Sequence, residues 1–169
     1  MAINLATGAP LEPELIVPGV AAIAAQFVFV LLMVGLGEEP AWRGYALPRL
    51  LAQRTALTAA LLLGLFHIIW HLPLFGREYN LDNVLPWAIT VLCVAVITTW
   101  MWLHTGGSLL LPMLLHTSNN SVTFVWGWFV APDQLRLWWV WAGLWVAATV
   151  AIVAVNGTQL ARQAVRATT

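Results

Sequence analysis

The feature that most constrains the fold is the stretch between Asp82 and Asp133, which contains no Asp, Glu, Lys or Arg. In a soluble domain about a quarter of the residues carry a charge, so a charge-free segment of this length is not expected in a water-soluble fold. The whole chain of 169 residues has the same character, with 61% hydrophobic and 8% charged residues and a mean hydropathy of +0.84. The sequence therefore predicts an integral membrane protein.

A helix that crosses the hydrocarbon core needs about 20 apolar residues. Five uncharged stretches meet this requirement: 15–36, 55–75, 83–103, 107–130 and 137–155. We predict an all-α fold, a polytopic transmembrane helical bundle of about five spanning helices. A short helix that begins near Pro40 follows the first span, and glycines 35 and 37 predict a break before it. Whether the two form one kinked helix or two separate helices stays open.

The connections between these stretches are short, so residues 1–169 are predicted to form a single transmembrane domain. Its first 14 residues form a polar segment. Two groups of arginines, one in residues 40–54 and one after residue 160, fall on the same side of five spans. The positive-inside rule assigns that side to the cytoplasm, and we expect a multi-pass protein of a bacterial plasma membrane. Because the formal net charge is zero, no basic surface for nucleic acid is expected.

Three polar clusters interrupt the apolar sequence, at residues 38–43, 67–71 and 116–120. Ionisable groups are costly in hydrocarbon, so by default they indicate a functional site. If Arg54 marks the tip of a helical hairpin, Glu38 and His71 both lie about 25 Å from it at 1.5 Å per residue. The acid and the imidazole are therefore predicted to face each other. The cluster at 116–120 lies at the same depth if the arginine-rich hairpin tip protrudes beyond the level of the turn at residues 104–107.

Residues four apart share a helical face, and three such pairs occur within the clusters: Glu39 with Arg43, His67 with His71, and His116 with Asn120. A structural ion pair explains Glu39 and Arg43 as well as a functional role does. Each histidine taken alone is also consistent with a packing role. Glu38 is a second carboxylate with one cation near it, which makes it the candidate general base. The segment HIIWH has the spacing of a zinc-binding helix but lacks the glutamate of HExxH.

Together these motifs resemble the CPBP family, the intramembrane CAAX-type prenyl proteases and bacteriocin-processing or self-immunity (Abi) proteins. The family pattern is EExxxR, then an aromatic residue followed four positions later by His, then HxxxN. The matching residues here are Glu38, Glu39 and Arg43, then His71, then His116 and Asn120. The flanking segments WRGYALPRLL, WHLPLF and TGGSLLLPMLLH also match. The resemblance covers roughly residues 28–126.

The resemblance implies an endopeptidase that cleaves a peptide or protein substrate at the lipid bilayer, prenylated in the eukaryotic members. Glu38, assisted by His71, would activate a water molecule, and His116 with Asn120 would stabilise the oxyanion. Glu39 and Arg43 would support this arrangement. No cofactor is then required. Zinc held by His71, His116 and a carboxylate remains an alternative.

Two departures from the family pattern accompany the resemblance. His67 occupies the position of the family's aromatic residue. We expect a supporting role in packing, while orienting His71 and ligating a metal stay open as alternatives. The family also commonly has further amino-terminal spans, which this chain lacks. The competing function is a non-catalytic membrane protein, for bacteriocin immunity or for binding a peptide or an ion, in which the same polar groups do not cleave anything.

Overall fold

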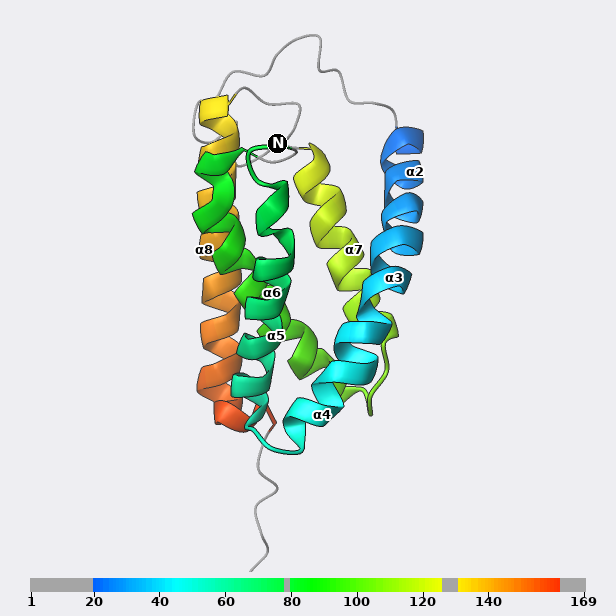
Figure 1. The fold of residues 1–169 in the computed structure, drawn as a ribbon, viewed down its shortest axis with the longest axis vertical. Coiled ribbons are helices and arrows are strands. Elements are labelled where there is room, and N and C mark those ends of the chain that lie inside the picture. Colours follow the sequence, from blue (N-terminus) through cyan, green and yellow to red (C-terminus); the bar gives the residue numbers. More distant parts are fainter. Residues whose placement is uncertain (1–19, 78–79, 126–130, 162–169) are drawn as a thin grey trace, which may run out of the picture.

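The computed structural model describes residues 20–77, 80–125 and 131–161, which form a bundle of helices (Figure 1). The predicted polar segment at 1–14 lies outside these ranges. The elements in chain order are α2 (Val20–Val30), the π-helical η1 (Leu31–Gly35), α3 (Leu36–Glu39), the π-helical η2 (Pro40–Ala46), α4 (Leu47–Leu51), α5 (Ala56–His71), η3 (Leu72–Leu74), η4 (Leu81–Asn83), α6 (Val84–His104), α7 (Leu110–Val125), α8 (Ala131–Asn156) and η6 (Gly157–Gln159). The predicted fold class is confirmed.

Within the described residues, four helical stretches are long and apolar enough to cross a membrane: Ile23–Leu51, Ala56–Leu74, Leu81–His104 and Gln134–Gln159. The fourth of the predicted spans corresponds to α7, of which 16 residues are described and which carries the polar HxxxN segment. This helix begins at Leu110, later than predicted, because residues 105–107 form a turn. Gly106 and Gly107 adopt φ values of 64° and 88° there, a left-handed conformation that glycine allows without strain.

The first helix does not break at its glycines. Gly35 (φ −56°, ψ −56°) and Pro40 (φ −59°, ψ −36°) are both right-handed helical, so the chain from α2 to α4 is one continuous helix. The predicted short helix after the acidic pair is the end of this same helix. The π-helical segments η1 and η2 lie on either side of α3, which carries the two glutamates. Such wide turns are often found at functional sites.

The predicted hairpin around Arg54 is confirmed, since residues 52–55 connect α4 to α5. Thr55 caps α5 by accepting a hydrogen bond from the Thr58 amide. Small residues then allow α5 to approach α6 closely. A Cβ atom added at Gly64 would lie 3.0 Å from a methyl carbon of Leu92 and 3.2 Å from the Cβ atom of Ala95.

Helix α6 is central, because it contacts α5, α7 and α8. Helix α7 also packs against the first helix at a close approach, where a Cβ atom added at Gly35 would lie 2.8 Å from Thr117 Oγ1. Through these contacts the polar clusters of the first helix, α5 and α7 face a common interior.

Candidate active site

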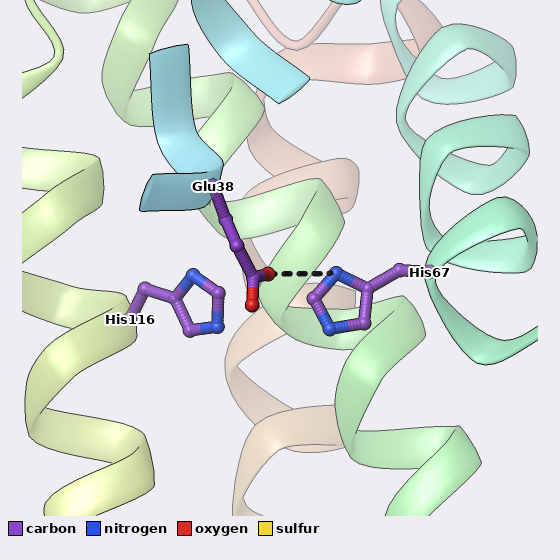
Figure 2. A group of neighbouring side chains, drawn as sticks. All are labelled: Glu38, His67 and His116. Atoms are coloured by element: carbon purple, nitrogen blue, oxygen red, sulfur yellow. Dashed lines mark ion pairs between the residues drawn. The ribbon is translucent and has the colours of Figure 1, made fainter. Parts of the chain in front are cut away.

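Glu38 lies between two imidazoles that come from different helices. Figure 2 shows its carboxylate between His67 of α5 and His116 of α7. Glu38 Oε2 is 3.9 Å from His67 Nδ1, and one ligating atom from each of the three side chains lies within 4.8 Å of the others. The side chains of His67 and Glu38 are 13% and 23% exposed, and His116 is buried. Residues separated by 78 positions in the chain, 38 to 116, therefore form one cluster.

Glu39 has a different environment from its neighbour. It is completely buried, and its Oε1 atom lies 2.8 Å from Arg43 Nη1 and 2.8 Å from His116 Nδ1. Arg43 also donates a hydrogen bond of 2.6 Å to Thr98 Oγ1 on α6. The ion pair expected from the spacing of Glu39 and Arg43 is present, and it connects the first helix to α6 and α7.

The contact with Glu39 also constrains the protonation of His116. A carboxylate oxygen accepts hydrogen bonds, so the proton on the imidazole lies on Nδ1. The second nitrogen, Nε2, then accepts a hydrogen bond in the neutral ring and donates one in the imidazolium form. His116 can therefore supply a donor or a ligand atom, depending on its charge.

Trp42 is a site residue that the sequence reasoning did not identify. Its indole Nε1 donates a hydrogen bond of 3.2 Å to Glu38 Oε2. Its ring also contacts His67, with ring centroids 5.5 Å apart, and Trp70, with centroids 5.8 Å apart. The signal in the sequence was the spacing, because Trp42 follows Glu38 by four residues and so shares its helical face.

His71 is not part of the group around Glu38, contrary to the depth argument. Its Nδ1 atom donates to the backbone carbonyl of His67 at 3.0 Å, and its ring stacks on the His67 ring with centroids 4.5 Å apart. The predicted depth of Glu38 requires α-helical geometry from Glu38 to Arg54, but the π-helical η2 lies in this segment. A π turn contains more residues than an α turn, so Glu38 lies nearer the hairpin tip and faces His67, one turn closer on α5.

The residues that could hold a metal in this geometry are His67, His116 and the Glu38 carboxylate, whereas the predicted set has His71 in place of His67. Three protein ligands with one open position are typical of catalytic zinc. A carboxylate that orients the distal nitrogen of a ligating histidine is also common, and Glu39 does this for His116. The distances of up to 4.8 Å exceed the about 3.3 Å between ligands around tetrahedral zinc. These residues could hold zinc after a small inward movement.

A cavity of about 440 Å³ opens beside the cluster, within the range of small-molecule and peptide sites. His67, His71 and His116 line it, together with Asn120 one turn beyond His116. The rest of the wall combines the Arg43 guanidinium, carboxamides, two threonine hydroxyls, aromatic rings and aliphatic side chains, including Asn83, Thr90, Trp87 and Val94. Three of the four residues predicted to be catalytic, His71, His116 and Asn120, line this cavity, and Glu38 contacts two of its lining residues, Trp42 and His67.

The arrangement is suited to hydrolysis by an activated water molecule. A carboxylate and imidazoles are the groups that most often act as general bases, and the cavity is large enough for a short peptide segment. The hydroxyl of Ser118 instead donates to the backbone carbonyl of Leu114, and Cys93 is buried within α6. Neither residue offers a nucleophile beside the cluster.

Comparison with known proteins agrees with this chemistry. The Rce1-like family, described as type II CAAX prenyl endopeptidases, matches residues 20–122, which is more than half of the chain. A protein of Methanococcus maripaludis named CAAX prenyl protease 2 is 32% identical over 102 residues, an alignment that covers 55% of this chain and 38% of that protein. The chain thus matches well under half of the length of this relative. With its apolar helices, the matched segment shows that the chain is an integral membrane protein of the Rce1-like family of type II CAAX prenyl endopeptidases.

Proposed function

We propose that the chain is an intramembrane endopeptidase that hydrolyses a peptide bond in the cavity beside Glu38. The observation that carries this proposal is the Glu38 carboxylate, which lies between His67 and His116, two histidines that line a cavity. Interhelical polar contacts in membranes are worth only about 0.6 kcal/mol on average. Their contribution to stability is therefore a poor explanation for three ionisable side chains at one depth.

In the proposed mechanism Glu38 is the general base. It removes a proton from a water molecule while the water oxygen attacks the carbonyl carbon of the peptide bond. The carbon–nitrogen bond then breaks, and the proton held by Glu38 passes to the leaving amine. His67 is the imidazole nearest to Glu38, at 3.9 Å, so we assign it the assisting role expected of His71. His71 orients the His67 ring by stacking on it.

The negative charge of the tetrahedral intermediate needs hydrogen-bond donors. We assign this role to Nε2 of protonated His116 and to the carboxamide of Asn120, which lie on one face of α7 and line the cavity. Glu39 stabilises the imidazolium through its contact with Nδ1. Because the two donors act on the same oxygen, the losses from their substitution by Ala are expected to be less than multiplicative.

A zinc ion held by Glu38, His67 and His116 would polarise the substrate carbonyl and make a bound water more nucleophilic. We favour the metal-free mechanism, since it leaves Glu38 available as the base. Exhaustive chelation followed by metal analysis distinguishes the two. Full activity without metal supports the glutamate mechanism, whereas loss of activity and its recovery with about one zinc per chain support the metal.

The substrate is proposed to be a membrane-proximal or prenylated peptide. The relative from Methanococcus maripaludis is named a CAAX prenyl protease, and the cavity lies among helices long enough to span a membrane. We also propose that the hairpin tip with Arg54 and the carboxyl end of α8 face the cytoplasm. The contact of η6 with α5 supports this, because it brings the carboxyl end of α8 to the end of α5 that begins after the hairpin turn.

The test is the cleavage of a fluorogenic lipidated peptide by the purified protein in detergent or nanodiscs. The parent should cleave it, and Glu38→Gln should not, because the amide keeps the shape of the side chain but cannot accept the proton. Comparable turnover by Glu38→Gln would refute the assigned base. Binding of the peptide without any cleavage by the parent would instead favour the non-catalytic alternative, an immunity or binding protein.

A further inference from the structure

A hydrogen bond connects Trp141 of α8 to the HxxxN segment of α7, and a second one continues from it to Asn120 within that segment. Trp141 Nε1 lies 2.9 Å from Asn119 Oδ1, although the two residues are 22 positions apart. Asn119 Nδ2 lies 3.3 Å from Asn120 Oδ1. Trp141 is outside the residues 20–122 that match the family, so family membership assigns it no role.

The direction of these hydrogen bonds follows from the chemistry of the groups. An indole N–H can only donate, so the atom of Asn119 that faces Trp141 must be the carbonyl oxygen. The amide nitrogen of Asn119 then points to its neighbour, where it can only donate. The facing atom of Asn120 is therefore also an oxygen. The hydrogen bonds therefore assign the orientation of both carboxamides. The shape of the group alone cannot do so, because its oxygen and nitrogen ends look nearly the same.

One end of the Asn120 carboxamide is thus engaged, and the other end is its NH₂ group. Asn119 and Asn120 both line the cavity. An oxyanion requires a donor, and a flipped carboxamide would present an oxygen that repels it. The hydrogen bonds from α8 favour the orientation that the chemistry needs.

We infer that Trp141 and Asn119 are positioning residues that hold the Asn120 carboxamide with its NH₂ group available to the substrate oxyanion. This inference rests on the proposed function, since it assumes that Asn120 stabilises an intermediate. It gives α8 a part in the site in addition to its packing on α6. Neither Trp141 nor Asn119 touches the reacting atoms in this scheme, because both act through Asn120.

The test compares Trp141→Phe with Trp145→Phe in the intact protein. Both substitutions remove an indole N–H on the same helix, and the two rings contact each other edge-on with centroids 5.7 Å apart. Trp145 Nε1 is buried without a hydrogen-bond partner among the described residues, so its removal breaks no such bond. Asn119→Asp is the second test variant, because it keeps the acceptor for Trp141 but replaces the donor to Asn120 with an oxygen.

Trp141→Phe and Asn119→Asp should lower kcat about tenfold with little change in KM, because an oxyanion contact is made in the transition state. This loss is smaller than the about 100-fold to 1,000-fold expected when such a donor is removed. Trp145→Phe should keep the parental kcat. In an Asn120→Ala background Trp141→Phe should cause no further loss, since the residue through which it acts is gone.

Equal kcat values for Trp141→Phe and Trp145→Phe, in proteins with the parental melting temperature, would overturn the inference. A further tenfold loss from Trp141→Phe in the Asn120→Ala background would also overturn it, because that would indicate a merely structural role. These results leave the proposed function intact. A parent protein that binds the peptide but never cleaves it refutes the proposed function itself, and the oxyanion role falls with it.

Discussion

The same substitution, Glu to Gln, should have different effects at the two adjacent glutamates, Glu38 and Glu39. Glu39 is fully buried and contacts both Arg43 and His116 at 2.8 Å, whereas Glu38 is 23% exposed and receives one hydrogen bond from Trp42. Glu39→Gln would leave the buried guanidinium of Arg43 without its counter-charge. Glu38→Gln would leave the ion pair of Arg43 with Glu39 intact. We therefore expect the first to lower stability and the second to abolish turnover.

The expected size of the effect follows from the burial of the pair. Removing one partner of a buried ion pair costs about 3–5 kcal/mol, and Glu39→Gln should fall at the lower end because the amide oxygen still accepts from Arg43. For a chain of this size 1 kcal/mol corresponds to about 2–4 °C. The melting temperature of Glu39→Gln should thus fall by on the order of 10 °C, and that of Glu38→Gln by far less.

The chain provides a direct assay for this difference, since its single cysteine, Cys93, is buried. A thiol-reactive fluorogenic dye should label Cys93 only as the bundle unfolds, which gives melting curves in detergent. Peptide cleavage by the same samples at a temperature below both transitions completes the comparison. Equal melting temperatures for Glu38→Gln and Glu39→Gln would refute the structural role of Glu39, and loss of cleavage by Glu39→Gln alone would reverse the assignment.

Three further substitutions test other contacts. Trp42→Phe should lower kcat about tenfold, because it removes the hydrogen bond to Glu38 and a hydrogen bond to a charged group is worth about 1.5–3 kcal/mol. The control is Trp70→Phe, which should keep the parental kcat because Trp70 is 65% exposed. Both are measured as kcat with melting temperature as the control for folding. His67→Phe keeps the packing of a ring but removes the assisting imidazole, so kcat should fall about 100-fold; parental turnover would return His67 to the packing role. Gly35→Ala should destabilise the protein by about 1–3 kcal/mol, since the new Cβ atom would lie 2.8 Å from a hydroxyl of α7, whereas Gly37→Ala meets no atom within 4 Å and should melt like the parent.

Features that depend on local composition and spacing were predictable from the sequence. The long apolar stretches predicted the membrane helices, since spanning a bilayer requires length and hydrophobicity and little else. The hairpin tip near Arg54 followed from the charges between two such stretches. The pairing of Glu39 with Arg43 followed from their spacing of four residues on one helix. Each of these properties involves residues close together in the chain.

The relative position of the clusters depended on the tertiary structure. Hydropathy does not reveal where a helix widens into π turns, and these turns bring Glu38 opposite His67 instead of His71. Contacts between helices could not be predicted either. The separation of Trp141 from Asn119 in the chain does not indicate which faces of α7 and α8 meet. The sequence determined which chemical groups lie inside the membrane, and packing decided which of them touch, since that depends on the phase and rise of each helix at the point of contact.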